Sequence, residues 1–247
     1  MIWNFQIGIL LVSCNSENAP DCFQNAGEIV RKEVAVPDFS SITVFERVEL
    51  IIKQGDVQKV EIESGEFLLD EVSAEVEGNS LVLRNENSCN LFREYGLTRI
   101  YVTSPNITEI RSSTSYPIAS DGVLGYPNLR LLSESFANPE AETTDGAFDL
   151  EVDSVTLSLL ANGIAYFKLR GQVQGLNITI AAGDSRVDAS NLSAGIVDLN
   201  HRGTNDILIN PQESLRGTIR GTGNVISFNR PPEVAVETIF RGELIFR

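Results

Sequence analysis

The sequence predicts an all-β protein whose C-terminal half is a parallel β-helix, a solenoid with coils of about 20 residues. Glycines recur every 20 residues at Gly163, Gly183, Gly203 and Gly223, and Gly242 follows after 19. Each glycine precedes a short apolar segment, and a second apolar segment follows at a nearly constant distance. Two strand-like segments per repeat are what one coil of a solenoid requires.

The five glycines are expected to be structural turn residues. A coil changes direction at its corners, where glycine tolerates positive φ and close backbone approach. Stacked coils would satisfy each other's backbone groups and bury one continuous core. A β-sandwich of evenly spaced hairpins is the alternative. The first apolar segments are 166–169, 187–189, 207–209, 225–228 and 244–246; the second are 176–178, 196–199, 215–219 and 234–236.

The N-terminal half alternates apolar and polar residues, which is typical of half-buried strands. Turn signals at Gly55, Gly65 and Gly78 separate the strands. We therefore expect one all-β domain over 36–247, with a β-rich region over 36–104 and coils over 105–247. Residues 138–146, which are small and acidic, are expected to loop out. The alternating apolar residues are Ile42 and Val44; Val48, Leu50 and Ile52; Val60 and Ile62; Leu81 and Leu83; Ile100 and Val102.

Residues 1–14 are typical of a bacterial export signal that ends at a lipidated cysteine. The apolar stretch 2–12 is too short to span a bilayer as a helix, although no Lys or Arg precedes it. The sequence LVSC at 11–14 resembles the lipobox, in which cleavage leaves the cysteine as the acylated first residue. We expect Cys14 to anchor the protein to the outer membrane of the cell envelope and 15–35 to be a tether. A buried N-terminal strand is the alternative.

Two further cysteines, Cys22 and Cys89, remain. In an exported protein two such cysteines are expected to form a disulfide. They are too few to hold zinc with the single histidine, so we expect no metal and no cofactor.

The charge of the chain argues against nucleic-acid binding. The sequence has 34 acidic and 19 basic residues and a net charge of −15, which repels phosphate backbones. The arginines at 216, 220, 230 and 241 are too far apart in the sequence to suggest a basic patch.

Signatures of common enzymes are absent: there is no nucleophile elbow, P-loop, His-Glu-x-x-His or dinucleotide fingerprint. His201 lies at a predicted corner, where we expect a surface turn residue rather than a general base. A carboxylate pair that cleaves glycans is the remaining catalytic option, although aspartates at turns usually bond their own backbone. The candidate aspartates are Asp184, Asp188, Asp198 and Asp206.

Aromatic residues are candidates for ligand contact, because exposed rings stack on sugars and proteins. They would otherwise cap the core. The candidates are Tyr116, Tyr126, Phe136 and Tyr166.

Several short motifs resemble one known family. The segments FSSITV at 39–44, VELIIKQGD at 48–56, RNENSCN at 84–90 and GTGNV at 221–225 resemble the auto-transporter adhesin "head GIN" domains, exported proteins common in Bacteroidetes. The resemblance covers residues 21–232, although this chain has fewer Gly-Ser-Gly turns. It implies a right-handed parallel β-helix, a disulfide between Cys22 and Cys89, an adhesive role, and no defined catalytic residues.

These observations together predict a non-catalytic envelope lipoprotein, anchored to the membrane, that acts as a binding or adhesion scaffold for a glycan or an envelope protein. The first alternative is a carbohydrate-active enzyme that uses the corner aspartates. The second is a structural partner of an envelope complex.

Overall fold

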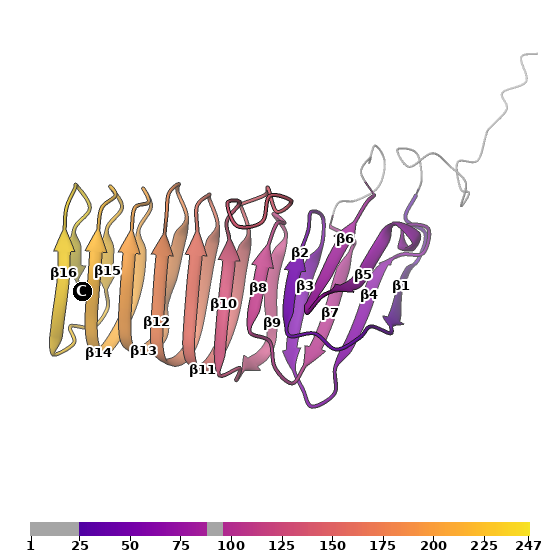
Figure 1. The fold of residues 1–247 in the computed structure, drawn as a ribbon, viewed down its shortest axis with the longest axis horizontal. Helices are drawn as coiled ribbons and strands as arrows, with labels where there is room; N and C mark the ends of the chain where they lie inside the picture. Colours follow the sequence, from indigo (N-terminus) through magenta and orange to yellow (C-terminus); the bar gives the residue numbers. More distant parts are fainter. Residues whose placement is uncertain (1–24, 88–95) are drawn as a thin grey trace, which may run out of the picture.

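The computed structural model describes residues 25–87 and 96–247. Within these ranges the chain forms seventeen strands and one turn of 3-10 helix, η2 (Leu69–Glu71). All seventeen strands belong to one sheet that extends along the long axis of the molecule (Figure 1). The same ranges contain no helix with the length and apolar character needed to cross a bilayer.

The N-terminal part of the sheet mixes both pairing directions. The antiparallel pairs are β1 (Ile29–Val34) with β4 (Lys59–Gly65), β4 with β7 (Arg99–Ser104), and β5 (Val72–Glu77) with β6 (Ser80–Asn85). The parallel pairs are β2 (Ser41–Val44) with β6 and β8 (Glu109–Ser112), and β3 (Glu49–Gln54) with β7 and β9 (Pro117–Leu124).

The C-terminal part contains long parallel strands that lie side by side. After β10 (Asn128–Ser133) they are β11 (Ala147–Ala161), β12 (Tyr166–Ile180), β13 (Arg186–His201) and β14 (Ile207–Ile219). Three short strands complete the sheet: β15 (Val225–Ser227) and β16 (Glu233–Thr238) pair with β14, and β17 (Leu244–Phe246) pairs with β15.

The expected right-handed parallel β-helix is wrong. The protein is all-β, but its single sheet combines antiparallel and parallel strands and curves round the core into a nearly closed barrel. The N-terminal strands are part of this sheet, because β2 and β3 pair with β8 and β9 as well as with β6 and β7. The C-terminal repeat does not predict the antiparallel pairs, because these pairs join N-terminal segments that have no sequence repeat.

The strand pattern within each repeat also differs from the expectation. The two apolar segments predicted for the repeat at 166–178 are the two ends of one strand, β12. Phe167, Leu169 and Val173 are buried at odd positions, whereas Leu176, Ile178 and Ile180 are buried at even ones, so two neighbouring residues, 174 and 175, face outward between the two sets. The strand continues through this one-residue shift in the alternation of buried residues. In the sequence, the same shift is read as a gap between two separate strands.

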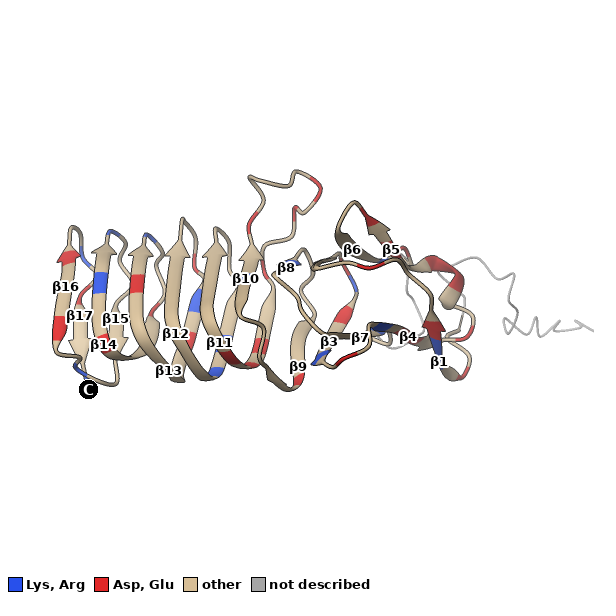
Figure 2. Ribbon diagram, turned by 60° about the horizontal axis from the view of Figure 1, so that its bottom comes forward, with Lys and Arg blue, Asp and Glu red and all other residues tan. Residues whose placement is uncertain are grey.

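Two segments were expected to lie outside the sheet, and only one of them does. Strand β1 lies inside the expected tether 15–35 and pairs with β4 along its whole length, so the folded part begins before residue 36. Residues 134–146 connect β10 to β11 and project from the sheet, as Figure 2 shows, which agrees with the loop expected at 138–146.

The core lies inside the curved sheet and runs through both parts of the molecule. The alternating apolar residues predicted in the N-terminal half are all buried there. In the C-terminal half the same inward position on successive strands is taken by Phe148, Phe167, Val187 and Ile207, which are in register and buried. The rings of Phe148 and Phe167 stack with their centroids 4.8 Å apart.

Candidate functional site

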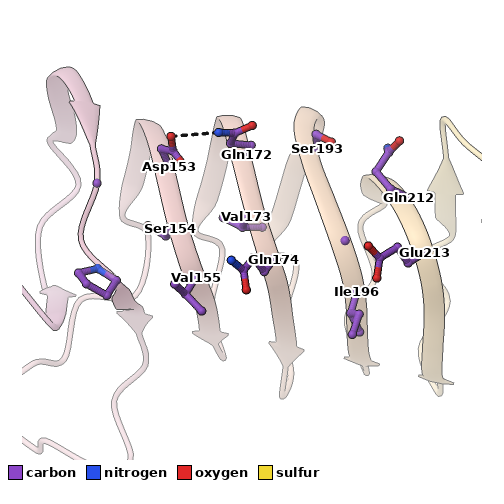
Figure 3. Close-up of a pocket in the computed structure, with 13 residues that line it drawn as sticks. Asp153, Ser154, Val155, Gln172, Val173, Gln174, Ser193, Ile196, Gln212 and Glu213 are labelled. Atoms are coloured by element: carbon purple, nitrogen blue, oxygen red, sulfur yellow. Dashed lines mark hydrogen bonds between the residues drawn. The ribbon is translucent and has the colours of Figure 1, made fainter.

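A groove of about 690 Å³ crosses the middle of the four long strands (Figure 3). Its residues come from β11, β12, β13 and β14, with Gly125 and Pro127 at one end. The side chains that matter for its chemistry are Asp153, Gln172, Gln174, Ser193, Gln212 and Glu213.

The phase shift in each strand explains where the groove lies. Two consecutive residues face away from the core at the middle of each strand: 155–156, 174–175, 195–196 and 212–213. Because these positions are in parallel neighbouring strands, the side chains present there lie in a row across the sheet; Gly175 and Gly195 contribute none. The sequence analysis missed these residues, although the paired outward positions between apolar segments were the available signal.

Polar side chains form a ladder along the groove. Asp153, Gln172 and Ser193 are in register on β11, β12 and β13. The side-chain amide of Gln172 donates a hydrogen bond to the Asp153 carboxylate at 3.0 Å. Neighbouring strands are about 4.8 Å apart, so the ladder repeats its polar groups at that spacing.

Two exposed polar side chains of the groove are available for a ligand. Gln174 and Glu213 are exposed, and neither side chain forms a hydrogen bond or ion pair with any residue in the described ranges. In Figure 3 both stand beside apolar side chains, the exposed Val155 and the half-buried Ile196. An amide and a carboxylate next to small apolar patches suit a ligand that carries both hydroxyl groups and C–H surfaces.

The electrostatics of the groove favour an uncharged ligand. Asp153 and Glu213 are its only ionisable lining residues, and neither Lys nor Arg lines it. Elsewhere opposite charges face each other across neighbouring strands, as in the ion pair between Asp198 on β13 and Arg216 on β14. An anionic ligand would therefore meet repulsion in the groove without a cation to offset it.

The candidate aspartates do not share a site. None of the four lines the groove. The side chain of Asp188 accepts a hydrogen bond from Ser190, that of Asp198 accepts from Arg216, and that of Asp206 accepts from the backbone N–H of Asn224. Asp184 lies at a turn near Asn205, where Thr204 donates a hydrogen bond to it. Each carboxylate thus has a partner that stabilises its own turn or strand.

His201 is not the surface turn residue that the sequence suggested. It is the last residue of β13 and is fully buried, because its side chain faces inward in register with Ile180 and Ile219. Its Nε2 has no hydrogen-bond partner among the described residues. Burial lowers the pKa of His201, and nearby Asp206 opposes this effect only in part.

The aromatic candidates divide between surface and core. Phe136 and Tyr166 are exposed, and Tyr116 is half-buried. Tyr126 is buried and donates a hydrogen bond to the carbonyl oxygen of Ser104 at 3.2 Å, so it belongs to the core, the alternative given above for these rings, and is not a ligand contact. Burial raises the pKa of Tyr126. None of the four lines the groove.

The glycines of the repeat lie at successive turns. The N–H of Asp184 donates to the carbonyl oxygen of Gly163, and the N–H of Thr204 donates to that of Gly183. A Cβ on Gly183 would lie 2.2 Å from the carbonyl oxygen of Gly163, and its φ is +85°. Further along, the N–H of Gly223 donates to Gly203, and a Cβ on Gly242 would lie 2.1 Å from the carbonyl oxygen of Gly223.

The predicted lipidation and disulfide residues, Cys14, Cys22 and Cys89, lie outside the described residues. Within the described ranges no three His, Cys, Asp or Glu side chains are grouped to hold a metal ion.

Solved structures with the same fold include proteins from Bacteroidetes. A putative adhesin from Bacteroides fragilis superposes with a TM-score of 0.78 at 19% identity, covering 90% of this chain and 99% of that one. A putative lipid binding protein from Parabacteroides distasonis has a TM-score of 0.62 at 16% identity, covering 90% and 97%. A putative adhesin from Parabacteroides merdae has a TM-score of 0.62 at 15% identity, with the same coverage.

At these identities the likeness shows the fold alone. Among proteins with curated descriptions, none matches this chain. A family model matches residues 38–231, which is most of the chain and includes the groove. The resemblance inferred from short motifs is therefore confirmed: this chain belongs to the family described as "Putative auto-transporter adhesin, head GIN domain".

Proposed function

We propose that this protein is a non-catalytic adhesion protein of the bacterial cell envelope that binds a linear, uncharged glycan in the groove across β11–β14. The observation that carries the proposal is the polar ladder of Asp153, Gln172 and Ser193, with Gln174 and Glu213 free of protein partners beside it. The family's description as adhesins supports the general role.

The geometry of the ladder suits a chain of sugars. Groups repeat at the strand spacing of about 4.8 Å, which is close to the length of one sugar in an extended chain. Amides and carboxylates bind hydroxyl groups, whereas Val155 and Ile196 offer apolar surface to the C–H faces of the rings. The two carboxylates select against acidic polysaccharides.

The location of the groove agrees with this role. Strand β1 lies at one end of the long axis, and the groove lies toward the other (Figure 1). We further propose that the chain is an outer-membrane lipoprotein anchored through Cys14, with Cys22 and Cys89 joined in a disulfide. An anchor on the N-terminal side would leave the groove away from the membrane.

Binding to a panel of neutral and acidic glycans tests the proposed ligand. We expect neutral linear glycans to bind, and Gln174→Ala and Glu213→Ala each to weaken binding by about fivefold to tenfold, since each removes hydrogen bonds worth about 1 kcal/mol. Thr179→Ala is the control, because Thr179 faces outward on β12 but does not line the groove. Because the proposed role is non-catalytic, the bound glycan should be recovered uncleaved after the binding experiment.

Two results would overturn this proposal: the absence of binding to every neutral glycan, or binding that the groove variants leave unchanged. The anchor is tested separately by metabolic labelling with a fatty acid. Cys14→Ala should abolish the label and release the protein from membranes, and a labelled Cys14→Ala protein would refute the anchor.

A further inference from the structure

The C-terminal end of the sheet has two free edges. Within the described residues β16 pairs only with β14, and β17 pairs only with β15. Each strand therefore has one side without a strand partner. Unpaired backbone groups on such an edge are a template for another strand.

The backbone of β17 is oriented for pairing at this edge. The carbonyl oxygen of Glu243 accepts from the N–H of Val225, and the N–H of Arg247 donates to Ser227, both at 2.9 Å. The backbone groups of Glu243 and Arg247 thus point toward β15. Because these groups alternate in direction along a strand, those of Leu244 and Phe246 point to the free side.

The free edge is also apolar. Leu244 and Phe246 are only partly buried and pack against the end of the core, while Ile245 faces outward and is 36% exposed. Nearby, Ile239 and Phe240 are exposed in the turn before β17. At the other end of the molecule, among the described strands, β1 pairs only with β4 and β5 pairs only with β6, so each also has a free side, but these two strands carry charged residues, which protect an edge from pairing.

We propose that β17 pairs antiparallel with β17 of a second copy of this chain, about a two-fold axis that passes through Ile245. In this register Leu244 lies opposite Phe246 of the second copy, and Ile245 lies opposite itself. The pairs of Leu244 with Phe246 are the hydrogen-bonded ones, since these residues carry the free backbone groups, and their side chains extend the core across the interface.

Charge complementarity selects this register. The residues next along the strand are Glu243 and Arg247, and antiparallel pairing about Ile245 places each of them opposite the other in the second copy. The two ion pairs lie on the outer face, to either side of the Ile245 pair. Strand β16 is less suited, because pairing about its Ala235 would oppose Glu233 to Glu237, and like charges directly opposite destabilise a sheet.

A second copy fits the edge better than a lipid surface does. A bilayer would cover Phe240 and Ile245 but would leave the backbone groups of Leu244 and Phe246 without hydrogen-bond partners. A strand satisfies these groups and covers the apolar residues together.

The oligomeric state of the folded protein, measured by light scattering and sedimentation over a range of concentrations, tests the proposal. We expect a dimer. Ile245→Lys should dissociate it, because two lysines would meet at the axis, whereas Val57→Lys at the far end, where Val57 is 76% exposed, should not. Glu243→Arg and Arg247→Glu should each weaken the dimer about tenfold by like-charge opposition, and the double variant should restore it.

Cross-linking checks the register. The Cα atoms of a non-hydrogen-bonded antiparallel pair are about 4.5 Å apart, within disulfide range. Ile245→Cys should therefore form a covalent dimer under oxidation, whereas Val57→Cys should not. A monomer at all concentrations, a dimer insensitive to these changes, open-ended oligomers, or a requirement for a different partner protein would each refute the proposal.

Discussion

The carboxylate of Glu134 and the guanidinium of Arg111 form an ion pair inside the protein, and the Glu134 side chain has no exposure to solvent. Arg111 lies on β8, and Glu134 immediately follows β10. The same carboxylate accepts hydrogen bonds from the backbone N–H groups of Phe136 and Ala137, at 3.0 and 2.9 Å. One buried charge therefore joins a strand to the start of the loop 134–146.

Removing one partner of this pair should be costly. Arg111→Met leaves the buried carboxylate without its counter-ion, and we expect a loss of about 3–5 kcal/mol in the free energy of unfolding. The double change Arg111→Met with Glu134→Leu should recover much of that loss. Denaturant unfolding measures both. A single variant as stable as the original would show that the pair is not buried in solution.

The same ion pair should make the folded protein less stable in acid. Burial raises the pKa of Glu134, but hydrogen bonds from Arg111 and the backbone outweigh this effect and lower the pKa below 4.5. The unfolded chain then binds a proton more readily, so the stabilisation is present above the unfolded pKa and is lost as the pH falls through the lowered pKa.

Alanine variants of Gly183 and Gly122 distinguish the cost of backbone strain from the cost of a steric clash. Their φ angles are +85° and +87°, but a Cβ at Gly183 would collide with the carbonyl oxygen of Gly163, whereas a Cβ at Gly122 meets nothing within 4 Å. Both alanine variants incur the strain of positive φ, about 1–2 kcal/mol. Gly183→Ala should cost about 2 kcal/mol more in thermal or denaturant unfolding. Equal losses would contradict the close approach of the two turns.

His201 should make the protein less stable in mildly acidic solution. Burial lowers its pKa, so the unfolded chain, with a pKa near 6.5, binds the proton more readily than the folded protein does. Stability should fall as the pH drops below about 6.5 and level off below the lowered pKa. His201 is the only histidine in the sequence, so melting temperatures of His201→Gln between pH 5.5 and 7.5, about the working range of histidine, should lose this dependence. A dependence that persists would assign it to other groups.

Ile207 tests the interior of the C-terminal repeats. Its side chain is fully buried, as the sequence predicted. Ile207→Asp places an unpaired charge in the core and should cost more than about 4 kcal/mol, enough to unfold most of the protein. Val123→Asp on β9 is the matched control, because Val123 is 50% exposed. Circular dichroism and thermal melting distinguish the two. Unchanged melting of Ile207→Asp would place that residue outside the core.

Sequence patterns were sufficient for local features of this fold. Alternation at Leu50 and Ile52 predicted the buried face of β3, and the glycine spacing predicted which segments lie side by side, as with Val187 and Ile207. Both features repeat at short or regular intervals, so they are visible in a single sequence.

Features that depend on distant pairing were not predictable in this way. Ile42 pairs with both Leu81 and Ile110, and no period in the sequence connects these three residues. The expected solenoid was wrong for this reason. His201 was placed at a corner because the apolar segment ends at residue 199, whereas strand β13 continues to His201 and its alternation turns that side chain inward.

The groove illustrates a third limit. Gln174 and Glu213 are unremarkable polar residues in the sequence, and they matter because a one-residue phase shift brings them to the same surface. A search for catalytic motifs has no means to find a site built from ordinary amides on neighbouring strands.

The ladder of long strands has a consequence for how such proteins can diversify. Each strand from β11 to β14 forms its sheet pairs with adjacent strands, roughly one repeat away in the sequence. Duplicating or deleting one repeat would lengthen or shorten the groove by a single step of about 4.8 Å, while the remaining strands keep their partners. Under the proposed function, the number of repeats would therefore set how many sugar units one molecule can hold.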